Sequence, residues 1–125
     1  MKLKNPTPQK NVFPMAVVLG RSNSVQRLVQ VVSQTFDSIR LIESQEELER
    51  HPATLSPQLT VVTDSFPGGV SPGLLDQVKN KLSPGVLICL ANNISVKKEI
   101  DLRSIGLVFL GSYQEFFDRA GAIIQ

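Results

Sequence analysis

The sequence predicts an α/β fold in which helices cover both faces of a parallel sheet. Five short apolar runs alternate with segments of helical periodicity along the 125 residues, and only a few residues connect one to the next. The runs are apolar at consecutive positions, as expected of strands that are buried on both faces. A chain of this length forms one domain, expected at 13–125 after a polar, lysine-containing leader at 1–12.

The first strand is predicted at residues 15–19, an apolar run that Gly20 ends. A helix is expected next, because apolar residues recur at the spacing of one helical face. These residues are Val25, Leu28, Val29, Val32 and Phe36. The hydroxyls within 22–24 are expected to cap this helix. A phosphate site at 20–24 is disfavoured, because the segment lacks the glycine and lysine spacing of a phosphate-binding loop.

The second strand is predicted at 39–42. Ser44 and Glu47 then form the pattern of a capping box, which opens a short helix that ends before Pro52. His51 precedes this proline with no second metal ligand nearby in the sequence, so it is expected on the surface, without a metal or catalytic role. With a single histidine the chain offers no Ser-His-Asp arrangement, and no enzyme is predicted.

The third strand, at 59–63, places the carboxylate of Asp64 at the carboxyl edge of the sheet. Ligands and reacting groups of open α/β sheets gather at this edge, which makes Asp64 the first candidate for chemistry. A loop with Pro67 follows, and Ser71 with Pro72 is the start signal of a helix. The apolar face of that helix is Leu74, Leu75, Val78 and Leu82.

Two further units complete the chain. The strand at 86–90 contains Cys89, which is expected to be buried and inert. A charged helix at 95–102 is expected to be the least stable element, because it offers few apolar groups for burial. The strand at 107–110 precedes a second capping box, Ser112 with Glu115. The last helix has the inner face Phe116, Phe117, Ala120, Ile123 and Ile124.

Right-handed crossovers between these units give a flavodoxin-like, doubly wound (βα)5 three-layer sandwich with strand order 2-1-3-4-5. Composition excludes several function classes. The net charge is only +2, the basic residues are spread along the chain, and there is one Tyr and no Trp, which argues against nucleic-acid binding. No apolar run could span a membrane and no secretory signal is visible, so a cytoplasmic location is expected. One cysteine excludes an internal disulfide and a thiolate metal cage.

Three segments, 16–29, 61–68 and 86–91, resemble the first strand and helix, the third strand and the fourth strand of the receiver domain of two-component response regulators. The resemblance extends over 15–125 and makes Asp64 the counterpart of the phosphoacceptor aspartate. A receiver holds magnesium with a pair of acidic residues after its first strand, because an aspartate and a phosphoryl group approach each other only when their charges are neutralised.

The other positions of that site carry different chemistry in this sequence. The resemblance places the acidic pair at Gly20 and Arg21, the hydroxyl residue of the fourth strand at Leu90, and the lysine after the fifth strand at Ser112. None of these residues can supply the group that the family uses. The resemblance therefore implies a pseudo-receiver in which Asp64 is not phosphorylated and no metal or cofactor is bound.

Arg21 suggests a substitute for the metal. Its guanidinium could form an ion pair with Asp64 and balance the carboxylate permanently, although such a pair at an exposed edge contributes only about 0 to 1 kcal/mol. The alternative is that both side chains are simply solvated.

The first functional hypothesis is a phosphorylation-independent domain that docks a protein partner, or a second copy of itself, in bacterial two-component-type signalling. Nucleic-acid and membrane partners are not expected. The resemblance implies an interaction face on the fourth helix, fifth strand and fifth helix, with Lys97, Lys98, Arg103, Phe109 and Tyr113. Two alternatives are an atypical phosphoacceptor that uses Asp64 and a flavodoxin-like module that binds a small molecule near 20–24.

Overall fold

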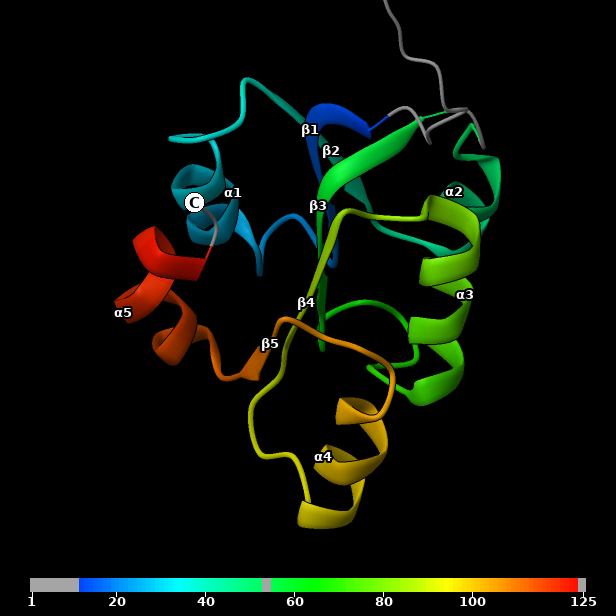
Figure 1. The fold of residues 1–125 in the computed structure, drawn as a ribbon, viewed down its shortest axis with the longest axis vertical. Helices are drawn as coiled ribbons and strands as arrows, with labels where there is room; N and C mark the ends of the chain where they lie inside the picture. Colours follow the sequence, from blue (N-terminus) through cyan, green and yellow to red (C-terminus); the bar gives the residue numbers. More distant parts are fainter. Residues whose placement is uncertain (1–11, 53–54, 124–125) are drawn as a thin grey trace, which may run out of the picture.

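The computed structural model describes residues 12–52 and 55–123, which form a sheet of five parallel strands in the order β2-β1-β3-β4-β5 (Figure 1). The strands are β1 (Val12–Leu19), β2 (Ser38–Ile42), β3 (Ser56–Thr63), β4 (Val86–Leu90) and β5 (Phe109–Gly111). The helices are α1 (Gln26–Val32), α2 (Gln45–Arg50), α3 (Pro72–Leu82), α4 (Val96–Arg103) and α5 (Tyr113–Ile123). The predicted fold class and strand order are confirmed, while most of the expected leader lies outside the described residues.

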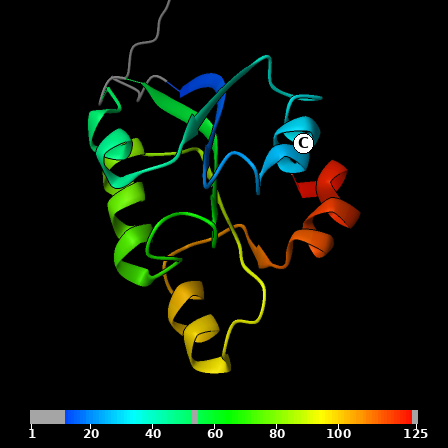
Figure 2. The same cartoon turned by 180° about the vertical axis from the view of Figure 1, so that it is seen from behind.

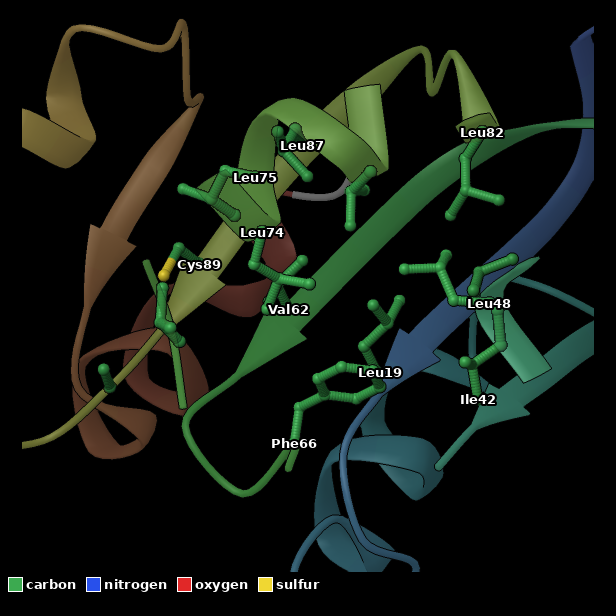
Figure 3. Packing of buried hydrophobic residues seen from close by; sticks show 14 of the residues in the cluster. Leu19, Ile42, Leu48, Val62, Phe66, Leu74, Leu75, Leu82, Leu87 and Cys89 are labelled. Atoms are coloured by element: carbon green, nitrogen blue, oxygen red, sulfur yellow. The ribbon is translucent and has the colours of Figure 1, made fainter. Parts of the chain in front are cut away.

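Helices cover the sheet from both sides. Figures 1 and 2 show α1 and α5 on one face and α2 and α3 on the other. Each face buries its own apolar cluster, because successive side chains of a strand point to opposite faces. In β1, Val17 and Leu19 belong to the cluster under α2, α3 and α4, whereas Ala16 and Val18 belong to the cluster under α1 and α5. Figure 3 shows the first of these clusters, in which Phe66 packs beside Leu19.

The register of the strands brings their carboxyl ends to one edge. Leu19 of β1 lies opposite Val62 of β3, the neighbouring Thr63 lies opposite Leu90 of β4, and Leu90 lies opposite Gly111 of β5. The residues that follow these strand ends therefore meet at the same edge of the sheet, which is where an open α/β sheet places its functional groups.

Local hydrogen bonds confirm the predicted helix starts. The Ser44 hydroxyl accepts from the Glu47 amide at 3.2 Å, and the Ser71 hydroxyl accepts from the Leu74 amide at 3.1 Å. Caps of this kind are each worth about 1 kcal/mol. Among the helices within 12–52 and 55–123, none is long and apolar enough to cross a membrane.

The start of α1 differs from the prediction. The helix begins at Gln26 after Val25, and no side chain caps it. Residues 21–25 instead form a backbone turn, in which the amides of Ser24 and Val25 both donate to the Arg21 carbonyl. The amide of Ser22 donates to the Glu43 carboxylate at 3.0 Å. The hydroxyls in 22–24 were thus wrongly expected to act as caps.

His51 is buried, with 1% of its surface exposed, so its prediction as a surface residue is wrong. It caps the carboxyl end of α2, where the chain turns and brings the Leu55 carbonyl within 2.7 Å of Nε2. Because a carbonyl only accepts, Nε2 carries the proton. Nδ1 is buried without a hydrogen-bond partner in the described part of the chain. Burial is the main cause that lowers the pKa of this imidazole, and the charges of Arg40 and Lys81 add to it against the Leu55 hydrogen bond.

The charged helix α4 contributes little to the core. Leu102 is its only buried residue, while the side chains of Val96 and Ile100 are 75% and 64% exposed. By contrast, α3 buries all four residues of its predicted apolar face. In α5, Phe116 and Ala120 are buried as predicted, and Ile124 lies outside the described residues.

Candidate functional site

Asp64 lies at the centre of the carboxyl edge, directly after β3, with an exposed side chain. Its backbone amide donates to the Leu90 carbonyl at 3.0 Å, which continues the pairing with β4. Both carboxylate oxygens accept hydrogen bonds, Oδ2 from the Asn92 amide at 3.0 Å and Oδ1 from the Tyr113 hydroxyl at 3.1 Å. The carboxylate thus connects the end of β3 to the loop after β4 and to the first residue of α5.

Gly20, the first counterpart of the acidic pair, occupies a space without room for any side chain. A Cβ at this position would lie 2.3 Å from the Thr63 hydroxyl oxygen, 2.6 Å from that of Ser65 and 2.9 Å from a methyl carbon of Val25. Such approaches are far inside van der Waals contact, so even alanine would force its neighbours to move. An aspartate cannot enter here without rearrangement of the strand end.

The two hydroxyls beside Gly20 form a chain of hydrogen bonds. The Thr63 hydroxyl donates to the Leu19 carbonyl at 2.9 Å, so the Ser65 hydroxyl donates to Thr63 at 2.8 Å. The Ser65 oxygen in turn accepts from the Arg21 amide at 3.0 Å. This chain joins the ends of β1 and β3, and each bond polarises the next.

Arg21, the second counterpart of the acidic pair, has an exposed side chain. The suggested ion pair with Asp64 is not formed. The side-chain ion pairs within the described residues are Arg50 with Glu46 and Arg103 with Glu99. Arg21 and Asp64 instead line one open cavity of about 430 Å³ together with Ser24, Ser65 and 66–69.

Leu90 and Ser112 also perform structural tasks. Leu90 is fully buried in the cluster under α1 and α5. The Ser112 hydroxyl accepts from the Glu115 amide at 3.1 Å, and the Glu115 carboxylate accepts from the Ser112 amide at 2.9 Å, which is the predicted capping box. Leu90 therefore serves the core and Ser112 caps α5, and neither supplies the hydroxyl or the ammonium group that the resemblance places at its position.

Tyr113 makes a contact that the sequence analysis did not anticipate. It was assigned to the interaction face, yet its hydroxyl reaches Asp64, 49 residues earlier in the chain. The sequence did contain a hint of this contact. Tyr113 directly follows Ser112, the counterpart of the family's lysine, and a phenol at that place is long enough to reach Asp64. Burial is the main cause that raises the pKa of this phenol. The charge and hydrogen bond of Asp64 act in the same direction, and the hydroxyls of Thr63 and Ser65 act against them.

The remaining candidates lie on α4, in β5 and at the start of α5. Lys97, Lys98 and Arg103 are exposed, and the Nε of Arg103 donates to Glu99 at 3.0 Å. Phe109 and Tyr113 are half-buried against the cluster under α1 and α5. The sequence analysis missed the three exposed large apolar residues, Val96, Ile100 and Val108. For Val96 and Ile100 the sequence did contain a hint. They are an apolar pair four residues apart in a charged helix, on a different side of it from Leu102.

Cys89 is fully buried, and burial together with the charge of Asp64 raises the pKa of its thiol to about 12. The thiol therefore stays protonated near neutral pH, in agreement with an inert cysteine.

The residues at the family's magnesium position do not fit that ion. A glycine without space for a side chain and an exposed arginine offer no oxygen ligand from a side chain, whereas magnesium is bound through carboxylates and other oxygens. Within 12–52 and 55–123, no group of three or more His, Cys, Asp or Glu side chains could hold a metal ion. Among the positions that the resemblance assigns to this site, Asp64 carries the residue type that the resemblance implies.

No protein-family model matches the sequence, and no curated protein matches it. Nine solved chains are similar in structure. A response regulator from Burkholderia pseudomallei with a phosphorylated aspartic acid, calcium ion and citrate has a TM-score of 0.73 at 10% identity, over 90% of this chain and 67% of that one. The receiver domain of HemR from Leptospira biflexa, not phosphorylated, has a TM-score of 0.70 at 15% identity, over 90% and 95%.

The dimer of the beryllofluoride-activated NtrC4 receiver domain has a TM-score of 0.68 at 16% identity, over 90% of this chain and 97% of that one. These identities are low, and the likeness concerns the fold, including the strand order. The chain therefore has the fold of response-regulator receiver domains.

Proposed function

We propose that this chain is a receiver-like domain of two-component-type signalling that works by docking a protein partner, without catalysis and without phosphorylation of Asp64. The observation that carries the proposal is the filled space at Gly20, where a receiver needs an acidic side chain. Two of the similar solved chains are a response regulator from Burkholderia pseudomallei and a receiver domain from Leptospira biflexa, which supports the signalling context.

The absence of a metal ligand at this position has a direct consequence for phosphoryl transfer. A carboxylate and a phosphoryl group are both negative, and a bound cation is what neutralises their repulsion in this reaction. The hydroxyls of Thr63 and Ser65 occupy the position of the first acid, and Arg21 places a positive charge at the second. In this proposal no metal ion is held beside Asp64 to neutralise the approach of a phosphoryl group.

The hydrogen bonds of Asp64 support the same conclusion. Its two oxygens accept from Asn92 and Tyr113, and attack on a phosphoryl group would have to weaken at least one of these bonds. Asp64 in this proposal is a structural acceptor that ties three connections together.

The exposed surface of α4 supports docking. Its side chains Val96 and Ile100 are large, apolar and exposed, and Lys97, Lys98 and Arg103 lie beside them. Contiguous apolar residues rimmed by polar ones mark protein interaction sites. Arg103 is paired with Glu99 on the same helix, so the attraction to an acidic partner surface rests on Lys97 and Lys98. The proposed face combines α4 with Val108 before β5 and with Phe109.

The test of the phosphorylation claim is a titration of the domain with magnesium and beryllofluoride, followed by amide NMR. We expect no saturable shifts at Asp64, Leu90 or Phe109, because no cation site forms. The matched control is Asp64→Asn, which keeps the size of the side chain. Saturable shifts in the natural chain that Asp64→Asn abolishes would instead establish the atypical phosphoacceptor.

The test of the docking claim places a photo-crosslinking amino acid at Ile100 in cells, with Gln30 on α1 as the control position. Both residues are exposed, but only Ile100 lies on the proposed face. We expect a specific crosslink from Ile100 that Lys97→Glu weakens, and none from Gln30. Equal crosslinking from both positions, or none from Ile100, would contradict docking through α4. A crosslink to a second copy of the chain would identify the partner as the chain itself.

A further inference from the structure

The position of the Tyr113 phenol is fixed by contacts other than its hydrogen bond to Asp64. Tyr113 is the first residue of α5, and the Ser112–Glu115 capping box holds that helix start through two hydrogen bonds. The Phe116 amide also donates to the Ser112 carbonyl at 3.1 Å. The ring packs against the apolar cluster under α1 and α5. A side chain anchored in this way presents its hydroxyl at little cost in entropy.

The partner of this hydroxyl also controls the loop before α4. Asp64 accepts from the Asn92 amide, and Asn92 lies four residues before Val96, the first residue of α4. The next residue, Asn93, has a left-handed backbone with φ of 58°, so the chain turns sharply directly after the bond. Within α4 only Leu102 is buried. The loop before it is also held by the Ala91 amide, which donates to the Gly111 carbonyl at 2.9 Å, and by Ile94, which packs against the cluster under α2, α3 and α4. The bond from Asn92 to Asp64 lies between these two contacts and fixes the exposed part of the loop.

We propose that Tyr113 is the positioning residue that holds Asp64, and through it the loop 91–95, in a single arrangement that presents α4 for docking. This inference rests on the function proposed above and adds how the docking surface is maintained without a phosphoryl group. The resemblance leads one to expect a charged lysine at Ser112, whereas here a neutral hydroxyl reaches Asp64 from the next residue, Tyr113.

The neutral donor has a chemical consequence. The bond exists only while the phenol carries its proton, because a tyrosinate can only accept and would repel the carboxylate. Lysine would neutralise Asp64, whereas Tyr113 orients the carboxylate and leaves its charge in place. The arrangement therefore depends on a proton at one defined oxygen.

The chain allows this bond to be observed directly, since it contains one Tyr and no Trp. The ultraviolet absorbance of ionised tyrosine consequently reports Tyr113 alone. In Asp64→Asn we expect Tyr113 to titrate at a lower pH than in the natural chain, because the carboxylate that disfavours the tyrosinate is gone. The matched control is Asp76→Asn on α3, which should leave the titration unchanged. A titration that Asp64→Asn does not move, or that Asp76→Asn moves equally, would overturn the inference.

The second measurement tests the link to the loop by hydrogen exchange of the Asn92 amide. Tyr113→Phe removes only the hydroxyl, and we expect exchange at Asn92 to become about fivefold faster or more, the change that follows from loss of about 1 kcal/mol. Phe117→Leu, which alters packing on the same helix and leaves the hydroxyl, should not change exchange at Asn92 beyond its effect on the whole domain. Unchanged exchange at Asn92 in Tyr113→Phe would overturn the positioning role.

The two proposals fail in different experiments. Saturable beryllofluoride shifts would end the proposal of a phosphorylation-independent domain, whatever Tyr113 does. Unchanged Asn92 exchange in Tyr113→Phe would end the positioning role and leave the docking proposal intact. If Tyr113→Phe does not fold, the absorbance titration of Asp64→Asn still decides the inference.

Discussion

The two halves of the carboxyl edge differ in how the chain fills them. At the ends of β1 and β3, the hydroxyls of Thr63 and Ser65 close against Gly20 and leave no space for a side chain. At the ends of β4 and β5, an exposed loop leads to α4, which buries one residue and exposes two large apolar ones. We call the ends of β1 and β3 the packed half and the ends of β4 and β5 the open half. The difference teaches that one sheet edge combines a position that excludes side chains with a region that exposes apolar ones.

The largest effect on stability is expected from an acidic residue at position 20, in the packed half. Gly20→Asp should lower the free energy of unfolding by about 4 kcal/mol or more, because it combines overpacking with a buried charge. Arg21→Asp, at an exposed site, should change it by less than about 0.5 kcal/mol. Denaturant unfolding of both variants measures the contrast. If Gly20→Asp is as stable as Arg21→Asp, the packed description of this half is wrong.

The next effect concerns the single anchor of the open half. Leu102→Ala should cost about 2 to 4 kcal/mol, because it creates a cavity beneath α4. Ile100→Ala on the same helix should change stability by less than about 0.5 kcal/mol, since Ile100 is largely exposed. The measurement is again denaturant unfolding. Similar losses in both variants would show that α4 has a second buried face.

Removal of the central hydroxyl tests the hydrogen-bond chain of the packed half. Thr63→Val keeps the shape but leaves the Leu19 carbonyl and the Ser65 hydroxyl without their partner, so we expect a loss of about 1 to 3 kcal/mol. Ser22→Ala is the control, because its hydroxyl caps no helix and should cost almost nothing. Thermal unfolding that ranks the two variants equally would contradict the role of the chain.

A pH dependence should arise at the opposite end of the sheet, from His51. Its pKa in the folded state is lowered below the unfolded value of 6.5, so between these two values the unfolded state binds a proton that the folded state does not. The contribution of His51 to the free energy of unfolding is therefore fully present above pH 6.5. It is lost as the pH falls from there through the folded pKa. His51→Gln keeps a donor for the Leu55 carbonyl and should remove this part of the slope. Identical slopes would show that the imidazole does not titrate on unfolding.

Much of the fold follows from local patterns. Apolar runs and their spacing predicted the five strands and the faces of α3 and α5. The caps at Ser44 and Ser112 were recognised from the glutamates three positions later, and the cap at Ser71 from the proline that follows it. These features depend on neighbours within one or two turns of the chain. Parallel pairing with short connections then allowed few topologies, which is why the strand order could also be predicted.

The candidate site was predicted only in part, because its contacts are long-range. The resemblance assigned site positions one by one, but it could not predict the contacts that the side chains at these positions make. Tyr113 reaches Asp64 across 49 residues, and Thr63 reaches Leu19 across 44. His51 was misjudged for the same reason, since its burial results from how the chain folds back after α2. The spacing of residues in the sequence does not predict such long-range contacts.

The filled space at Gly20 also bears on how this domain could change. An acid at position 20 could not be introduced by itself without strain, since its side chain would meet the oxygens of Thr63 and Ser65. Smaller residues would first have to appear at 63 and 65, and each of those steps would loosen the joint between β1 and β3. The stability of the fold therefore opposes each single step towards an acidic residue at position 20.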